Sequence, residues 1–107
     1  MSFKFSTTIS FQKEVKRLKK KFPSLPEDLI ILRGELLEDP YSGESIGKSC
    51  YKIRMAIHSK GKGKSGGARV ITCVKIIHET IYLLTIFDKS EKENISSQEL
   101  EELLSQI

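Results

Sequence analysis

The chain of 107 residues contains no tryptophan, two cysteines, three prolines and two histidines. Two cysteines are too few for a disulfide scaffold, and no group of Cys, His, Asp or Glu has the spacing of a metal site. The longest apolar runs, such as residues 81–86, are far shorter than the roughly 20 residues of a membrane span. The N-terminus also lacks the apolar region of a secretory signal. We therefore expect a single domain of residues 1–107 in the reduced cytoplasm, without a cofactor, a metal or a membrane partner.

Acidic residues are absent from one long segment. Residues 48–75 carry eight basic side chains and no acidic one, a local charge of +8. Residues 1–22 carry a charge of +6, whereas residues 23–47 and residues 76–107 carry −5 each. The four segments together give the net charge of +4. Cations that have no acidic neighbour in the sequence are solvated, paired with distant acids, or placed to bind a polyanion. Two such basic segments favour a nucleic-acid or phosphate partner.

Hydrophobic periodicity in the first half predicts one strand and two helices. Residues 3–6 alternate between apolar and polar, as a short strand does. Apolar residues spaced by four, three and four then predict a helix from near Ser10 to Phe22, where a proline follows. The sequence Ser24-Leu25-Pro26-Glu27 is typical of a capping box that begins a second helix, and Asp39-Pro40 ends it.

The second half predicts mainly strands. Residues 51–58 alternate between apolar and mainly polar side chains, and residues 68–77 and 80–87 are rich in β-branched and aromatic ones. Residues 40–49 are a loop or a weak strand. A second capping box at residues 96–99 begins a short closing helix. The predicted order is β-α-α-β-β-β-α, an α+β fold in which the two N-terminal helices pack on one face of an antiparallel sheet.

Cationic side chains gather on the predicted strands. Because successive side chains alternate between the faces of a strand, Lys52 and Arg54 share the face that is turned away from the core. Arg69 begins the neighbouring strand and can lie close to Arg54, and Lys89 follows the last strand. Like charges directly opposite each other destabilise a sheet, so we interpret this cluster as an anion site.

The glycine- and lysine-rich segment Ser59–Gly67 leaves two interpretations open. It contains Gly63-Lys64-Ser65, but a P-loop also needs a glycine five positions before Gly63, where His58 stands, and a helix rather than a strand afterwards. The segment is either a mobile connection or a cationic loop that closes on a phosphate backbone. In the second case its RNA-binding residues are Lys60, Lys62 and Lys64.

The lysines of the first helix, between Lys13 and Lys21, are equally open to two interpretations. They form either a solvated face or a contact with an acidic partner or with RNA. Solvation is the simpler interpretation.

The sequence resembles the RelE/HigB family of bacterial type II toxins, within the RelE/ParE superfamily. The most specific parts are YKIR (51–54), GGARV (66–70) and DKSEKENIS (88–96). The resemblance implies a microbial-ribonuclease-like domain with two N-terminal helices on a curved antiparallel sheet. It also implies an mRNA interferase that cuts messenger RNA on the ribosome and is silenced by a cognate antitoxin, commonly one with a helix-turn-helix domain.

Carried over by position, Lys52 and Arg54 match the two basic residues on the family's second strand, and Arg69 matches the arginine that opens the third. Lys89 or Lys92 falls near the basic residue after the fourth strand. The chain departs from the family at Ala68, where an aromatic residue is usual, and it has no counterpart of the C-terminal tyrosine or histidine.

Metal-free RNA cleavage assigns a role to each of these cations. The 2′-hydroxyl must lose a proton, the pentacoordinate phosphate must be stabilised, and the leaving 5′-oxygen must gain a proton. Neighbouring cations disfavour the charged form of a lysine, so Lys52 is the expected base. Arg54 and Arg69 are expected to hold the phosphate. Lys89 is expected to assist the leaving group, with His58 as the alternative, and Lys92 to bind RNA.

Two other functions remain open at this point. A ParE-like gyrase-poisoning toxin has the same fold but does not need the cationic cluster. A non-catalytic basic RNA-binding module fits the charge, although the sequence has no aromatic platform of the RNP type.

Overall fold

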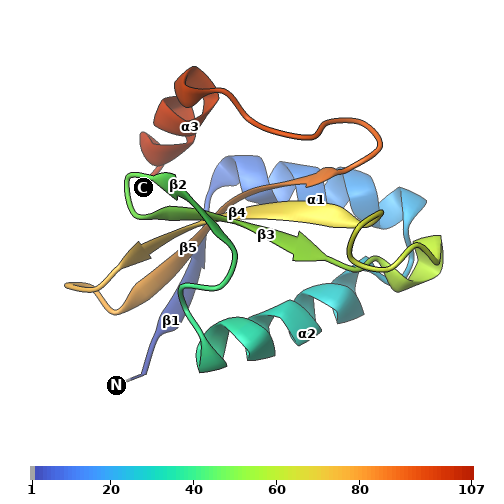
Figure 1. The fold of residues 1–107 in the computed structure, drawn as a ribbon, viewed down its shortest axis with the longest axis horizontal. Coiled ribbons are helices and arrows are strands. Elements are labelled where there is room, and N and C mark those ends of the chain that lie inside the picture. The colour runs from blue at the N-terminus through green and yellow to red at the C-terminus, as the bar shows by residue number, and fades with distance from the viewer. Residues whose placement is uncertain (1) are drawn as a thin grey trace.

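A computed structural model describes residues 2–107, which form three α-helices, five strands and one short 3-10 helix (Figure 1). The elements are β1 (Lys4–Thr7), α1 (Ile9–Lys21), α2 (Leu25–Glu38), β2 (Glu44–Gly47), β3 (Cys50–Met55), η1 (His58–Lys60), β4 (Ala68–Lys75), β5 (Thr80–Asp88) and α3 (Ser97–Leu104). The predicted order is confirmed, and of the two options for residues 40–49 the weak strand is present as β2.

The five strands form one sheet in the order β1-β5-β4-β3-β2. Strands β2 to β5 are an antiparallel meander, as the short connections predict. Strand β1 instead pairs parallel with β5, from Lys4 opposite Thr80 to Thr7 opposite Leu83. The α+β fold is therefore confirmed, with a sheet that is mixed rather than purely antiparallel. A parallel pair needs a long crossover, and here almost the whole chain lies between the two strands.

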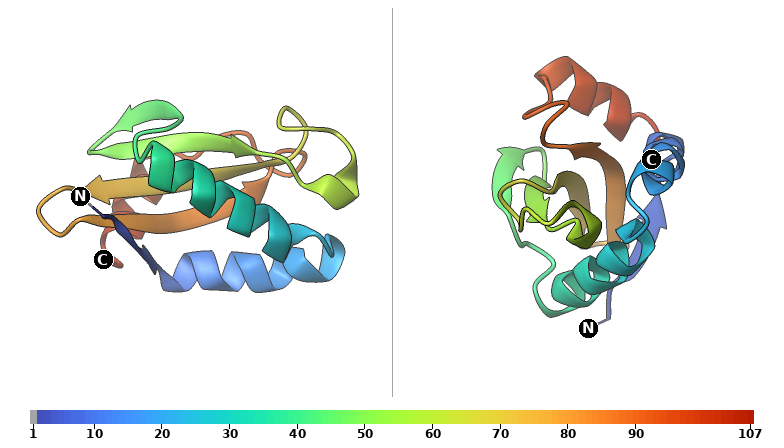
Figure 2. Two further views of the ribbon diagram at one scale, coloured as in Figure 1. Left: turned by 90° about the horizontal axis from the view of Figure 1, so that it is seen from below. Right: turned by 90° about the vertical axis from the view of Figure 1, so that its right-hand side faces the viewer.

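The helices cover both faces of the sheet. Seen from below, α2 lies in front of the strands, α1 runs alongside β5, and α3 lies behind the strands (Figure 2, left); α1 and α2 share one core. The two N-terminal helices therefore pack on one face, as predicted, and the closing helix packs on the other. No helix within residues 2–107 has the length and apolarity that crossing a membrane requires.

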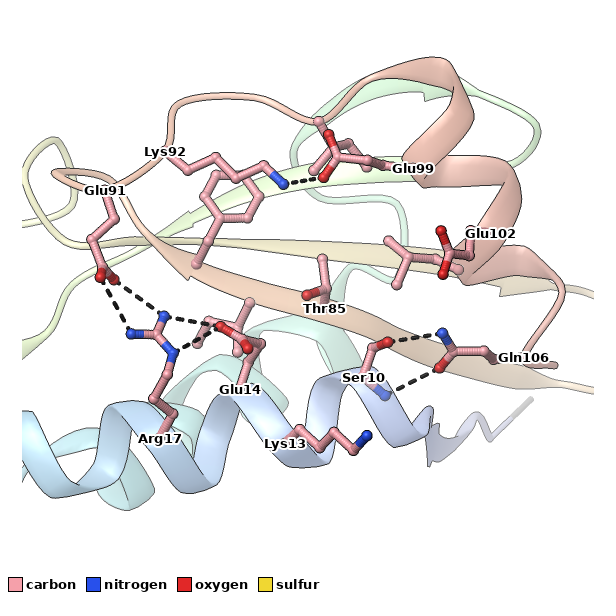
Figure 3. Close-up of a pocket in the computed structure, with 14 residues that line it drawn as sticks. Ser10, Lys13, Glu14, Arg17, Thr85, Glu91, Lys92, Glu99, Glu102 and Gln106 are labelled. Carbon is pink, nitrogen blue, oxygen red and sulfur yellow. Dashed lines mark hydrogen bonds and ion pairs between the residues drawn. The ribbon is translucent and has the colours of Figure 1, made fainter.

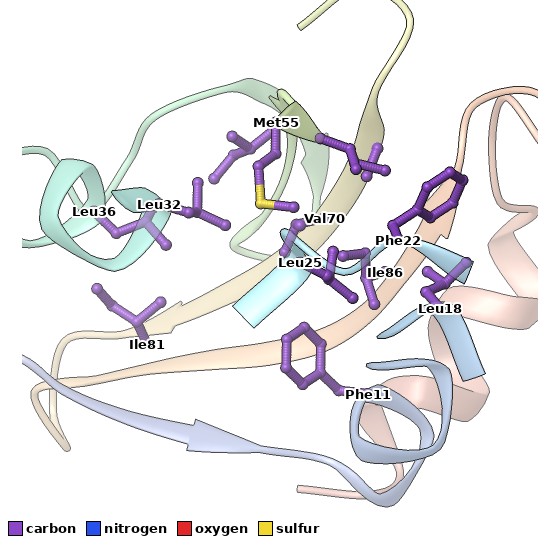
Figure 4. Close-up of a cluster of buried hydrophobic side chains, with 13 residues drawn as sticks. Phe11, Leu18, Phe22, Leu25, Leu32, Leu36, Met55, Val70, Ile81 and Ile86 are labelled. Atoms are coloured by element: carbon purple, nitrogen blue, oxygen red, sulfur yellow. The ribbon is translucent and has the colours of Figure 1, made fainter. Parts of the chain in front are cut away.

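The face under α1 and α2 carries the larger core (Figure 4). The predicted stripe of α1 is confirmed, because Phe11, Leu18 and Phe22 are buried. On α2 the buried stripe is narrow, since Ile30 and Leu37 are 70% and 49% exposed. The buried residues of this core are Phe11, Leu18, Phe22, Leu25, Leu32, Leu36, Ile53, Met55, Ile57, Ala68, Val70, Ile81 and Ile86.

The face under α3 carries a smaller core, made of Cys50, Ile71, Cys73, Leu84, Phe87, Leu100 and Leu103. Cys50 and Cys73 lie directly opposite each other on β3 and β4, as the sequence allowed, and both are free and buried. Burial, and then the neighbouring Cys73, raise the pKa of the Cys50 thiol to about 12.

One of the two predicted capping boxes forms. At α3 the Ser96 hydroxyl accepts from the Glu99 amide at 3.1 Å, and the Glu99 carboxylate accepts from the Ser96 amide at 3.0 Å. At α2, Ser24 occupies the N-cap position but makes no side-chain cap bond. Its hydroxyl donates to the Asp28 carboxylate at 2.8 Å instead, so the predicted box at Ser24 is wrong.

Candidate functional site

The ends of three strands meet at the end of the sheet beside the 58–67 connection (Figure 1). Arg54, near the end of β3, lies directly opposite Arg69, near the start of β4. Asp88 at the end of β5 pairs with Ala68, and the Lys89 amide donates to the Gly67 carbonyl at 3.0 Å. The fold therefore brings the backbone positions of Arg54, Arg69 and Lys89 to one place, as the register of three consecutive strands requires.

Arg69 is the buried member of this group, with 6% of its surface exposed. Its guanidinium donates to three backbone carbonyls, those of Lys64 at 3.0 Å, Ala68 at 3.1 Å and Ser65 at 3.3 Å. It makes no ion pair within residues 2–107. Burial, and then the charge of Arg54, lower the pKa of Arg69, against a smaller opposing effect of Glu93. An anion bound here would relieve both unfavourable effects.

Arg54 is the exposed member. Its side chain has no carboxylate partner in the described part of the chain, and it lines a cavity of about 210 Å³ together with Glu35 and Lys64. A guanidinium stays charged at neutral pH, so Arg54 and Arg69 place two permanent cations on neighbouring strands. This arrangement suits a doubly coordinated phosphate group.

Lys52 lies two residues before Arg54 on β3 and its side chain is 20% exposed. Its ammonium is hydrogen-bonded to the side-chain oxygen of Asn94 and lies 3.5 Å from the Glu44 carboxylate. Asn94 belongs to residues 89–96, which connect β5 to α3. Lys52 therefore lies on the strand of the arginine pair, and its ammonium is oriented by two residues of its own chain.

The remaining predicted cations have different surroundings. Lys89 is partly exposed and makes no ion pair in residues 2–107. Lys92 is paired with Glu99 of α3, lies 5.6 Å from the centre of the Phe87 ring, and lowers the pKa of the Glu99 carboxyl. Lys89 is therefore available at the end of β5, whereas Lys92 is tied to α3.

The loop lysines also differ from one another. Lys60 is 2.6 Å from the buried Asp88 carboxylate, and its side chain is only 13% exposed. Lys64 is exposed and lies 3.3 Å from Glu35 of α2, and Lys62 is exposed without an ion pair in the described chain. The pair of Lys60 with Asp88 joins residues 28 positions apart and could not be predicted from the sequence pattern.

His58 lies against α2. Its ring Nδ1 is 2.5 Å from the buried Asp28 carboxylate, because the chain turns into η1 soon after β3 ends. The structure therefore does not place His58 on the strand face of Lys52 and Arg54, where the alternation had suggested it.

A cavity of about 470 Å³ lies apart from this site, between α1, β5 and α3 (Figure 3). Several of its charged side chains are paired: Arg17 donates to both Glu14 and Glu91, and Lys92 pairs with Glu99. Ser10 and Gln106 are joined by two hydrogen bonds. Of the predicted site residues, Lys92 lines this cavity, whereas Arg54, Arg69 and Lys89 do not. We therefore place the candidate site at the strand ends.

The comparisons with known proteins agree on one family. The model of a family described as the RelE toxin of the RelE/RelB toxin–antitoxin system matches residues 26–106. A solved structure of an E. coli RelE mutant in the free state, with two arginines changed to alanine, is similar over 100% of this chain and 99% of that chain. Its TM-score is 0.65 and its identity 18%. The isolated E. coli RelE toxin is similar over 100% of both chains, with a TM-score of 0.61 and 19% identity. At these identities the structures show the fold.

Proposed function

The chain belongs to the RelE toxin family of toxin–antitoxin systems, and on that premise we propose that it is a ribosome-dependent mRNA endonuclease that inhibits translation in the cytoplasm. One observation carries the proposal. A buried guanidinium, Arg69, lies opposite a second one, Arg54, and neither has a carboxylate partner in residues 2–107. Two like charges opposite each other destabilise a sheet when no anion is bound between them. Binding of a phosphate is therefore the simplest explanation for the pair.

The proposed reaction uses four side chains of the chain and the 2′-hydroxyl of the RNA. Arg54 and Arg69 hold the scissile phosphate through paired N–H donors. Lys52 is the proposed base: its amine accepts the proton of the 2′-hydroxyl, and the 2′-oxygen attacks phosphorus. The bond to the 5′-oxygen then breaks, Lys89 supplies the proton to that oxygen, and a 2′,3′-cyclic phosphate is left. The arginines act most strongly on the pentacoordinate phosphate, where the negative charge is greatest.

The ribosome is proposed to supply what this set of residues lacks. The chain has two lysines rather than a histidine pair for proton transfer, and Lys52 is held by Asn94 and Glu44. Positioning of the mRNA by the ribosome contributes to the rate independently of these groups. Lys62, Lys64 and Lys92 are proposed to bind the RNA backbone beside the site.

An antitoxin partner follows from membership of a toxin–antitoxin family. We further infer that this antitoxin carries a helix-turn-helix domain and lays an acidic segment against the basic end of the sheet. Such a segment would neutralise the cations of residues 48–75, a stretch that has no acidic residue of its own.

Inducible expression with mapping of mRNA 5′ ends tests the proposal. Wild-type protein should arrest growth and generate new 5′ ends within translated messages. Lys52→Ala and Arg54→Gln should each reduce cleavage by a factor of about 100 or more, the usual cost of losing one group that stabilises the transition state. Lys75→Gln is the matched control, because it removes an exposed cation at the other end of β4. Circular dichroism must show that all variants are folded.

The same experiment separates the other candidate functions. A gyrase-poisoning toxin would cause DNA damage and leave mRNA intact. A non-catalytic RNA-binding module would neither cut RNA nor arrest growth. If both site variants cleave mRNA as well as wild type does, the proposed site is wrong.

A further inference from the structure

The lysine- and glycine-rich loop between η1 and β4 is anchored at its first residues by a buried acid of α2. Asp28, 2% exposed, accepts hydrogen bonds from the His58 amide at 3.2 Å, the His58 ring at 2.5 Å and the Ser24 hydroxyl at 2.8 Å. The Ser59 amide in turn donates to the Ser24 hydroxyl at 2.8 Å. The chain after β3 is thus joined to the N-terminal turn of α2.

A second buried acid holds the next residue of the loop. Asp88 has no exposed surface, and one of its oxygens lies 2.6 Å from the Lys60 ammonium and accepts from the Ser90 amide at 3.1 Å. The Lys60 ammonium also lies 5.8 Å from the centre of the Phe22 ring. The other oxygen of Asp88 lies 4.0 Å from the exposed Lys21 ammonium, so Lys60 is the nearer and more buried of its two cations. Removing the nearer partner of a buried carboxylate leaves its charge poorly compensated.

The far end of the loop is fixed to the start of β4. Arg69 donates to the carbonyls of Lys64 and Ser65, and Lys89 donates to that of Gly67. Gly67 itself leaves no room for a side chain, since a Cβ there would lie 2.2 Å from the Met55 carbonyl oxygen. Between these fixed ends, Lys62 remains exposed without a partner in residues 2–107.

We propose that Asp28, His58, Lys60 and Asp88 are positioning residues, which hold the loop so that Lys62 and Lys64 meet an RNA backbone, and that Lys60 does not contact RNA. The part that concerns RNA rests on the proposed function, whereas the anchoring does not. A loop ordered in the free protein loses less conformational entropy when it binds. The composition of the loop predicts mobility, and the two buried acids oppose it.

The salt dependence of RNA binding distinguishes a contact from an anchor. The logarithm of the affinity for a single-stranded RNA falls with the logarithm of the salt concentration, with a slope of about 0.7 per neutralised phosphate. Lys62→Met, the matched control, should lower that slope by about this amount. Lys60→Met should leave the slope unchanged and weaken binding about fivefold at every salt concentration, because the loop must then be ordered on binding. An equal loss of slope in both variants would overturn the proposal.

Lys60→Met removes the nearer of the two ammonium groups at the buried Asp88 and leaves only Lys21, 4.0 Å away, so the variant can fail to fold. The double variant Lys60→Met/Asp88→Asn removes both charges and keeps the measurement possible. It too should bind RNA with the wild-type slope. A slope reduced by about 0.7 in the folded double variant would show that Lys60 contacts RNA. That result would contradict the proposal that Lys60 only anchors the loop.

Trypsin sensitivity tests the anchor without RNA, since Lys62 and Lys64 are cleavage sites within the loop. His58→Ala should increase native-state cleavage in the loop at least tenfold. His58→Asn, whose side-chain amide can donate to Asp28 from nearly the same position as Nδ1, should restore protection. Equal cleavage of wild type and His58→Ala would show that Asp28 and His58 do not hold the loop. This result is independent of whether the protein cuts mRNA.

Discussion

The two faces of the sheet use the same strands in different ways. Under α1 and α2, the core extends along the sheet and continues through Met55 and Ala68 to the strand ends. Under α3, apolar packing includes Cys50 and Ile71, but Arg54 and Arg69 follow on the same strands. Side chains that are neighbours in sequence therefore serve packing on one face and charge on the other. The comparison shows that the fold gains its stability mainly from one face and leaves part of the other face for chemistry.

The largest expected effect concerns the two thiols under α3. The thiolate is the reactive form, and the pKa of Cys50, raised to about 12 by burial and by Cys73, lies well above the usual value of about 8.5. At pH 8 we expect alkylation of Cys50 in the folded protein to be roughly a thousandfold slower than in denaturant. Rapid modification of either thiol in native buffer would show that α3 does not shield this face of the sheet from solvent.

The next effect compares the two cores directly. Leu32→Ala, under α2, should lower the free energy of unfolding by about 3 kcal/mol in urea denaturation. Leu103→Ala, on α3 and 8% exposed, should cost about 2 kcal/mol, because the smaller core can relax more easily around the cavity. A larger loss at Leu103 would reverse the assignment of stability to the two faces.

The capping box of α3 should have a smaller and more local effect. Ser96→Ala removes the hydroxyl that accepts from the Glu99 amide and should cost about 1 kcal/mol. Ser97→Ala, one residue later and exposed, serves as the control. Hydrogen exchange should become faster in α3 and remain unchanged in α1 and α2. Faster exchange throughout the chain would mean that the two faces unfold together.

The smallest expected effect has the opposite sign. Arg54→Gln removes one of two like charges on neighbouring strands and should raise the free energy of unfolding by about 0.5 kcal/mol while activity is lost. Lys75→Gln should leave stability unchanged. If Arg54→Gln destabilises the protein, Arg54 contributes to the fold and not only to anion binding.

Much of the fold follows from local patterns in the sequence. The spacing of Phe11, Leu18 and Phe22 defines the buried side of α1, and alternation along residues 51–58 defines the two sides of β3. The parallel pairing of β1 with β5 was not predictable in this way. The sequence of a four-residue strand does not indicate its direction or its partner strand. Both depend on how the rest of the chain, including α1 and α2, packs in three dimensions.

The candidate site was predictable only in part, for the same reason. The opposition of Arg54 and Arg69 follows from the register of two consecutive strands. The pairs of His58 with Asp28 and of Lys60 with Asp88 join residues about 30 positions apart through a turn that the sequence does not define. One feature of the sequence does indicate that Asp28 is buried, because it lies between Leu25 and Leu32 on the buried stripe of α2.

The pairing of the first strand with the last has a consequence for biosynthesis. Residues 4–7 have no strand partner until residues 80–83 are made, and Lys89 joins Arg54 and Arg69 only after that. Such long-range closure is a slow step in folding, and it cannot begin on a nascent chain whose last strand is still inside the exit tunnel. The cationic end of the sheet therefore forms only after residues 80–89 have left the ribosome.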